Sequence, residues 1–424
     1  MDMILKNFES LAKTPLRRDA LEIIEAGYES ISIETIFENS LSLDHDRLTI
    51  GPQSFDLTQY EDIYVVGVGK GSSLAAKHIE HILGVHRIKS GIVIDITKRR
   101  LKKIRSYAGT HPLPSQKNIK ATNQMVHLLK QTQANDLVIA LICGGGSALA
   151  CQPGGLTCLE LQFISSVLLR AGATIQEINT VRKHVSLFHG GHMAAYAYPS
   201  TVASLIISDV PGDDLSMVSS GPTVMDATTR NQAQRIIKKY GLPNLQLLET
   251  PKDKRYFAKV HNILIAHGRT TLEAMKSKAR ALGYKPRVYS THVNGLANHV
   301  GPTMAKAVKP GEALIACGET EVIVSHPGKG GRNQDLALSA IGHLPAHSVI
   351  ISAASDGKDN VPVAGAIADS VWSVAQCKRK KINPHQAVEA NRSYKALRKL
   401  HDHLHINKVT ANVSDFMLVL RDMQ

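Results

Sequence analysis

The chain has 424 residues, 43% of them hydrophobic and 20% charged, and a formal net charge of +14. This composition supports sizeable cores and excludes global disorder, and the length predicts two or three domains. The longest apolar runs, such as 137–143, fall far short of the roughly 20 residues of a membrane span. Residues 1–18 contain no continuous hydrophobic block, so no secretory signal is indicated. We expect a cytoplasmic protein that makes no membrane contact.

The positive charge is concentrated in clusters at 98–105 and 378–381. Aromatic residues are only 4% of the chain, which leaves few stacking platforms for bases. We therefore expect no nucleic-acid partner, and interpret the basic faces as solvated surfaces that attract small anions. Five cysteines without a C-x-x-C pair indicate neither a disulfide framework nor a structural metal.

In chain order, residues 1–50 form a helical lead-in with apolar residues at helical spacing. From residue 61 onward, short β-branched runs alternate with helical stretches. This alternation predicts an α/β fold with a Rossmann-like, mostly parallel sheet covered on both faces. The expected strands are 63–66, 91–96, 137–143 and 202–208, and the expected helices are 72–83, 119–131 and 157–172.

A cluster of helix breakers at 241–244 marks the expected domain boundary. We predict an N-terminal domain over 1–243 and a second α/β domain over 244–424. Asn412 to Asp415 suit a helix start near the C-terminus. The second domain's expected strands are 262–266, 287–290, 313–316 and 349–353, and its expected helices are 270–282, 297–308 and 333–341.

The first glycine-rich turn follows strand 63–66 and carries Gly67, Gly69 and Lys70. Backbone amides there can cradle phosphate while the lysine reaches a phosphoryl group. The turn is not a Walker A loop, and Ser72 stands where a dinucleotide fingerprint needs its third glycine. Taken alone, the segment is better explained as a strand-to-helix turn with an exposed lysine.

A second cradle, Gly144, Gly145, Gly146 and Ser147, follows strand 137–143. It resembles a nucleophile elbow, but Leu149 stands where that motif requires glycine. Ser147 is therefore expected to cap a helix or bind phosphate.

Acidic residues follow two other strands. Asp209, Asp213 and Asp214 lie after strand 202–208, and Glu319 lies after strand 313–316. Carboxylates at a strand end suit Mg²⁺, which takes one or two of them together with substrate phosphates. Asp209 could instead accept a proton from a substrate hydroxyl, or all three could serve turns.

Two weaker signals lie nearby. Arg182, Lys183 and His184 could bind an anion, although a basic helix face is the commoner explanation. His111, between Thr110 and Pro112, is more typical of a turn than of a catalyst.

The most informative stretch is 328–340. Gly330 and Gly331 precede Arg332 and Asn333, which open an apolar helix pattern. Glycines allow close backbone approach, a helix N-terminus favours negative charge, and the guanidinium fork suits phosphate or carboxylate. This pattern predicts an anion site.

The stretch resembles the Gly-Gly-Arg-Asn-Gln signature of the glycerate 2-kinase family, whose C-terminal domain is named for its MOFRL motif. Eight further segments match that family in its order. They are 66–70, 109–114, 143–149, 178–184, 204–214, 220–223, 318–320 and 356–359.

The resemblance implies ATP- and Mg²⁺-dependent phosphorylation of D-glycerate at its 2-hydroxyl, in an active site within the interdomain cleft. Lys70 and Arg332 would be catalytic on opposite walls, with Asp209 as base or metal ligand. Gly67, Gly69, the 144–147 turn, Gly330 and Gly331 would bind phosphates. Arg332, Asn333 and Glu319 would bind the substrate, and Asp209, Asp213 and Asp214 the metal.

This chain departs from the family pattern in its C-terminal half. The differences lie at 267–269, Asp335, 360–362 and 409–413, where the last segment lacks the usual glycines. Two alternatives therefore stay open: a hydroxypyruvate reductase-type oxidoreductase, and a catalytically impaired relative.

Overall fold

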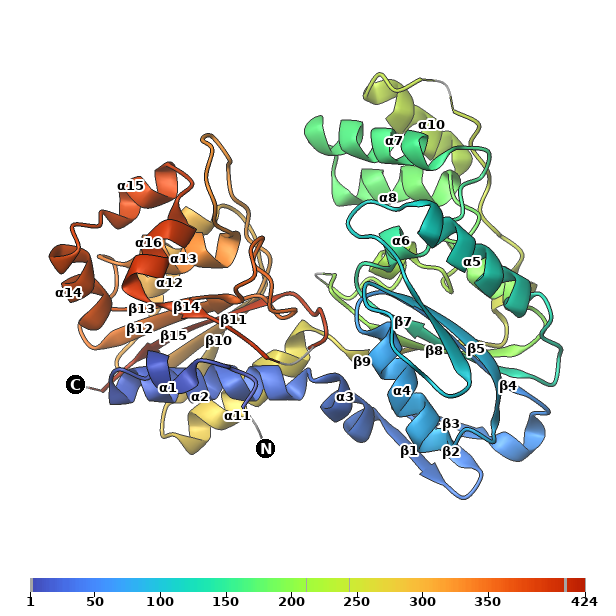
Figure 1. Ribbon diagram of the computed structural model, residues 1–424, viewed down its shortest axis with the longest axis horizontal. Coiled ribbons are helices and arrows are strands. Elements are labelled where there is room, and N and C mark those ends of the chain that lie inside the picture. The colour runs from blue at the N-terminus through green and yellow to red at the C-terminus, as the bar shows by residue number, and fades with distance from the viewer. Residues whose placement is uncertain (1–2, 211, 244, 408–409, 424) are drawn as a thin grey trace. The chain divides into compact units, whose positions relative to one another are not determined.

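The structure is a computed structural model that describes residues 3–210, 212–243, 245–407 and 410–423. The chain divides into two compact units (Figure 1). Ile36–Ile265 form one unit, and Met1–Thr35 together with Ala266–Gln424 form the other. No helix in the described ranges combines the length and apolar character required to cross a membrane.

The 36–265 unit is built on a six-stranded sheet. Neighbouring pairs from β6 through β8 are parallel, which confirms the mostly parallel sheet. Its central strands are buried along their whole length, as expected when helices cover both faces. In spatial order the strands are β6 (Ile104–Ala108), β5 (Ile88–Asp95), β4 (Ile63–Val68), β7 (Leu137–Ile142), β8 (Thr201–Ile207) and β9 (Val260–Ala266).

Helices of this unit start at recognisable caps. Thr157 and Glu160 form a capping box at the start of α7, which agrees with the expected helix 157–172. Helices α7, α8 and α10 share a separate apolar cluster and lie together at one end of the unit (Figure 1). The helices are α4 (Ser72–Leu83), α5 (Gln116–Leu129), α6 (Gly146–Leu149), α7 (Cys158–Arg170), α8 (Ile175–His184), α9 (His192–Ala197) and α10 (Arg230–Lys239).

The other unit contains a mixed six-stranded sheet. Strands β10 and β11 are parallel, whereas β11, β15, β12, β13 and β14 pair antiparallel. Its strands, in spatial order, are β10 (Lys285–Val293), β11 (Glu312–Gly318), β15 (Asp415–Arg421), β12 (Ser348–Ala353), β13 (Gly365–Asp369) and β14 (His403–Leu404). Its helices are α1 (Phe8–Leu11), α2 (Pro15–Ser30), α11 (Gly268–Ala281), α12 (Ala297–Ala307), α13 (Arg332–Ala340), α14 (Trp372–Arg379), α15 (Pro384–Glu389) and α16 (Ser393–Leu400).

Two local expectations are wrong. The helical lead-in ends with α3 (Ile33–Ser40), and β1 (Leu41–Asp44), β2 (Arg47–Ile50) and β3 (Gln53–Asp56) form a small antiparallel sheet. The segment at Asn412–Asp415 does not start a helix but leads into β15, at the centre of the second sheet. Both segments are extended because they pair with neighbouring strands. The spacing of apolar residues along one segment gives no information about such pairing.

The division between units also differs from the expected boundary after residue 243. Strand β9, expected in the second domain, instead joins the first sheet beside β8. At the other end, α2 packs against α11, β12 and β15. Tyr28 donates to the Ala354 carbonyl (2.9 Å), and its ring meets that of Phe416 edge-on at 4.7 Å. The N-terminal helix therefore completes the core of the C-terminal unit.

Candidate functional site

The two glycine-rich turns of the 36–265 unit lie side by side at the carboxyl edge of its sheet. Val68 of β4 is level with Ile142 of β7, and the Lys70 amide donates to the Gly144 carbonyl (2.9 Å). Strand β8 ends at the same level, so Asp209 follows at that edge as well. This is where open α/β sheets bind ligands.

Lys70 lies against the second turn. A Cβ built on Gly145 would be 3.5 Å from the Lys70 Cγ and 3.1 Å from the His111 Nε2. Gly145 adopts a φ of +80°, which favours glycine. The structure thus brings Lys70, His111 and the 144–147 turn together.

The first turn, in contrast, does not offer a free backbone cradle. The Gly69 amide donates to the Ile94 carbonyl (3.1 Å), and Gly67 lies inside β4 between two paired strands. The Asp95 carboxylate accepts from the amides of Gly71 (3.2 Å) and Ser73 (3.1 Å) at the start of α4. In this structure the Gly69 amide serves the sheet, Gly67 lies within it, and the chain's own carboxylate fills the helix end. The phosphate role of Gly67 and Gly69 therefore stays a prediction that these contacts do not support.

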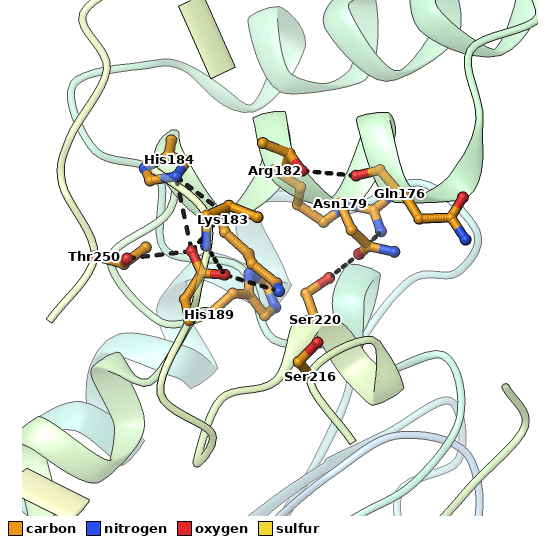
Figure 2. Close-up of polar contacts among 12 residues, drawn as sticks. Gln176, Asn179, Arg182, Lys183, His184, His189, Ser216, Ser220 and Thr250 are labelled. Atoms are coloured by element: carbon orange, nitrogen blue, oxygen red, sulfur yellow. Dashed lines mark hydrogen bonds and ion pairs between the residues drawn. The ribbon is translucent and has the colours of Figure 1, made fainter. Parts of the chain in front are cut away.

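Two consecutive serines fix the second turn. Ser219 Oγ donates to the Cys143 carbonyl (2.6 Å), and Ser220 Oγ lies 2.8 Å from Ser147 Oγ. Ser220 also donates to Asn179 Oδ1 (2.6 Å), which accepts in turn from Arg182 Nη1 (3.3 Å). Figure 2 shows this chain of contacts running from the serine toward helix α8.

A pocket of about 350 Å³ opens beside this turn. Its apolar wall comes from residues such as Leu113, Leu161 and Leu169. Its polar lining includes His111, Ser147, Gln152, Arg182, Ser186 and His189. A concave, largely apolar site with a few convergent polar groups is typical of small-molecule binding.

The three basic residues at the end of α8 have different roles. Lys183 Nζ is buried and pairs with Asp226 Oδ1 (3.1 Å). His184 lies between the Leu248 carbonyl (2.8 Å) and Thr228 Oγ1 (3.2 Å). Lys183 and His184 therefore stabilise the fold, and Arg182 alone of the three lines the pocket.

The three aspartates after β8 do not gather into a ligand set. Across the described ranges, no three His, Cys, Asp or Glu side chains are placed to hold a metal. Asp214 accepts from the Ser216 amide (2.9 Å), as in a turn, and Asp213 has a φ of +55°. The intervening Pro211 lies outside the described residues. Asp209 remains close enough to the 143–147 turn that its charge, after burial and Asp95, raises the pKa of Cys143.

In the other unit, the structure brings Arg332, Asn333 and Glu319 together around a carboxylate that sequence reasoning missed. Arg332 donates from Nε and Nη2 to Asp415 (2.5 and 3.1 Å) and from Nη1 to Glu319 (2.9 Å). Asn333 Nδ2 donates to the same Asp415 (2.9 Å). Burial raises the pKa of Asp415 to about 7, and Arg332 opposes that rise.

The start of α13 is also occupied by a side chain. Asp359 accepts from the amides of Asn333 (3.2 Å) and Gln334 (2.9 Å). A Cβ on Gly331 would lie 2.3 Å from the Asp359 Cγ, and one on Gly330 would lie 2.1 Å from Ser393 Oγ. The predicted phosphate-binding role of Gly330 and Gly331 is therefore not supported, because these glycines make room for neighbouring protein groups.

Lys70 and Arg332 belong to different units. Each has its own polar surroundings, and their joint action on one substrate stays a prediction.

Sequence reasoning missed four residues of these sites. Ser219 stands directly before the 220–223 segment that matches the family, so a signal was present there. No local pattern marks Gln152, His189 or Asp415, because their roles arise from contacts distant in sequence.

Fold and sites together define a class: a two-unit α/β protein whose polar turns at strand ends suit small anions. Family models match in two places, a domain of unknown function (DUF4147) at 19–249 and the MOFRL family at 312–415.

Relatives cover nearly the whole chain. The D-glycerate 2-kinase of Thermotoga maritima is 32% identical over 96% of this chain and 98% of its own. A putative hydroxypyruvate reductase of Agrobacterium vitis is 34% identical over 84% and 86%. The crystal structure of a glycerate kinase from Thermotoga maritima superposes with a TM-score of 0.84 at 31% identity, covering 95% of this chain and 99% of that one. The chain therefore belongs to the glycerate kinase family with a C-terminal MOFRL domain.

Proposed function

We propose that this protein transfers the γ-phosphoryl group of ATP to the 2-hydroxyl of D-glycerate, giving 2-phospho-D-glycerate. The observation that carries the proposal is the match over almost the entire length to a relative named D-glycerate 2-kinase. Because both chains are covered almost completely, the similarity includes both units.

The 36–265 unit supplies groups suited to phosphate. Lys70 lies against the 144–147 turn, where an ammonium group and Ser147 can hold phosphate oxygens. Phosphoryl transfer requires positioning and charge neutralisation more than covalent help, and a lysine beside a fixed turn provides both.

Mg²⁺ would be held at this edge of the sheet by Asp209 alone, with triphosphate oxygens and water completing its shell, because magnesium often takes only one or two carboxylates. Bound there, the ion would neutralise charge on the triphosphate. We choose Asp209 among these aspartates because it lies two residues after the end of β8 and its charge raises the pKa of Cys143 in the adjoining turn. As a base, the same carboxylate could instead accept the proton of the 2-hydroxyl.

Arg332 is proposed as the second cation acting on the substrate. Its three bonds to Asp415 and Glu319 use three of the five guanidinium N–H donors, and 32% of its side chain is exposed. The two carboxylates orient the guanidinium while donors remain for an anion.

Lys70→Ala tests the kinase assignment. Loss of the ammonium should reduce kcat/KM for D-glycerate by about 100-fold or more, since an oriented charge on a transferring phosphoryl contributes about 3 kcal/mol. The measurement is ADP release with D-glycerate, L-glycerate and tartronate, with NMR to locate the phosphoryl group in the product. Lys77→Ala, on the outer side of α4, is the control. Activity of the Lys70 variant close to wild type would remove the role of that residue.

A reductase is the second candidate, because two relatives bear the name putative hydroxypyruvate reductase. The first turn lacks the third glycine of a dinucleotide fingerprint, at Ser72, which argues against it. Ligand binding raises the melting temperature of the native state. We expect ATP to raise it and NADH to leave it unchanged; the reverse result would favour the reductase.

A further inference from the structure

The pocket beside the 144–147 turn contains a cation that the protein does not neutralise. Arg182 donates from Nη1 to Asn179 (3.3 Å) and forms no ion pair within the described ranges. Among the residues that the structure describes, no aspartate or glutamate lines the pocket. By contrast, buried Arg17 contacts Asp369 and Asp402, and buried Lys183 contacts Asp226. Arg182 is partly buried, and burial lowers the pKa of its guanidinium. An anion in the pocket would replace the water that this cation loses and stabilise its charge.

His189 offers a second unused donor to this pocket. Ser186 Oγ accepts from the amides of Phe188 (3.1 Å) and His189 (3.3 Å), so its own proton points to His189 Nδ1 (2.9 Å). The neutral ring then carries its hydrogen on Nε2. That atom is buried and has no hydrogen-bond partner among the described residues. A backbone contact with Gly146 raises the pKa of the ring but does not outweigh burial. Burial, and then the charge of Arg182, lower the pKa of His189 to about 3, which keeps the ring neutral.

Gln152 contributes the complementary group. Its side-chain Oε1 is buried and has no donor among the described residues. Buried polar atoms are nearly always paired, so an unpaired acceptor at a pocket wall indicates a ligand donor such as a hydroxyl. The pocket therefore presents two kinds of donor suited to an anion and one acceptor suited to an alcohol.

We infer that this pocket binds the hydroxy acid itself: Arg182 and the Nε2–H of His189 hold its carboxylate, and the Gln152 amide accepts from a hydroxyl. The identity of the acid rests on the proposed function. The volume of about 350 Å³ accommodates a three-carbon acid and leaves space along Gly145 and Ser147. The bound acid would thus lie next to the turn that Lys70 contacts, with its hydroxyl near the phosphate-binding groups.

Arg182→Gln provides the test, with calorimetric titration of D-glycerate and of D-glyceramide, its neutral analogue. Wild type should prefer the acid, because a charge-assisted pair adds about 10- to 100-fold in affinity. The variant should lose this preference while it binds D-glyceramide within about threefold of wild type. Retention of the preference would overturn the assignment of Arg182. Weakened ADP binding with an unchanged preference would also overturn it, because Arg182 would then contact nucleotide phosphate.

Three further variants make the result specific. Arg235→Gln removes an exposed cation of the same unit and should change neither affinity. Arg182→Lys keeps the positive charge but lacks the planar guanidinium, so its preference for the acid over the amide should lie between those of wild type and Arg182→Gln. This variant also tests the role of the charge if Arg182→Gln is poorly folded. Gln152→Met should weaken the acid and the amide alike, since both carry the hydroxyl. Unchanged binding of both ligands by Gln152→Met would remove its role.

The inference and the proposed function can fail separately. A wild type that does not phosphorylate D-glycerate contradicts the proposed function. Titration with lactate and malate then still tests the pocket: loss of their binding in Arg182→Gln supports an acid-binding site, and equal binding in both proteins contradicts it.

Discussion

Arg332 has two roles, the proposed binding of substrate and pairing with a buried carboxylate, whereas the sequence pattern predicts only the first. Its position in the Gly-Gly-Arg-Asn-Gln segment predicts contact with an anionic substrate. The structure adds that its guanidinium is the counter-ion of Asp415, whose side chain is only 3% exposed. A substitution at this position therefore affects stability as well as catalysis.

Arg332→Ala should lower the free energy of unfolding by about 2–3 kcal/mol, below the full value of a buried pair because the arginine is partly solvated. Burial raises the pKa of Asp415 to about 7, so the folded state binds that proton more tightly than the unfolded state. Stability therefore falls as the pH rises from the ordinary aspartate pKa toward 7. Removing Arg332, which opposes the shift, makes this loss larger.

Urea unfolding at pH 5 and pH 8 measures the effect. The deficit of Arg332→Ala should be larger at pH 8, because the unfolded state has released the proton of Asp415 there while the folded variant must either retain it or bury an unpaired charge. Arg269→Ala, in the same unit, controls for the loss of an arginine. An equal deficit at both values would show that Asp415 is not the group left unpaired.

Among the elements, α4 and α13 share one feature that their glycine-rich N-terminal sequences do not predict: a carboxylate of the protein itself binds the helix N-terminus. Each helix begins next to a carboxylate from another part of the chain, Asp95 for α4 and Asp359 for α13. Helix N-termini attract negative charge whether it comes from a ligand or from the protein. A glycine-rich turn before a helix therefore predicts an anion, but not its source.

Asp359→Asn should destabilise the protein by about 1–3 kcal/mol, because the amide group presents donors to the amides of Asn333 and Gln334. Thermal and urea unfolding give the change, with Asp44→Asn at the exposed end of β1 as the control. Wild-type stability in the Asp359 variant would mean that water caps α13 equally well.

For the whole molecule, the order of elements in space differs from their order in the chain. Residues 36–265 form one continuous unit, whereas the other unit combines the two ends of the chain. Helix α2 contributes Leu21, Ile24 and Tyr28 to fully buried positions in that unit. A fragment cut at the sequence-predicted boundary would lack them.

Residues 36–265 alone should therefore unfold cooperatively, whereas 244–424 alone should not. Burial of one large apolar side chain contributes roughly 2 kcal/mol to the free energy of unfolding. The 244–424 fragment lacks three such side chains and should lose about three times that amount. Circular dichroism melting of both fragments tests this, with a fusion of residues 1–35 to 266–424 as the control. Cooperative melting of 244–424 would show that α2 is dispensable for that core.

The sequence alone predicted the parallel sheet and the polar turns at its edge, because both depend on local patterns. Runs such as 137–143 are apolar at every position, which marks strands buried on two faces. Polar groups directly after such runs must then meet at one edge. The same pattern predicted that Lys70 and the 144–147 turn each follow a buried strand and bind phosphate.

Tertiary structure alone decided which groups occupy those turns. Asp415 lies 83 residues from Arg332, and β15 takes a central place in the sheet although its start suits a helix. Periodicity along a chain carries no information about which distant carboxylate fills a helix end or which strand pairs at a sheet's centre. Those choices depend on the combined burial, pairing and charge of segments that meet only in the folded protein.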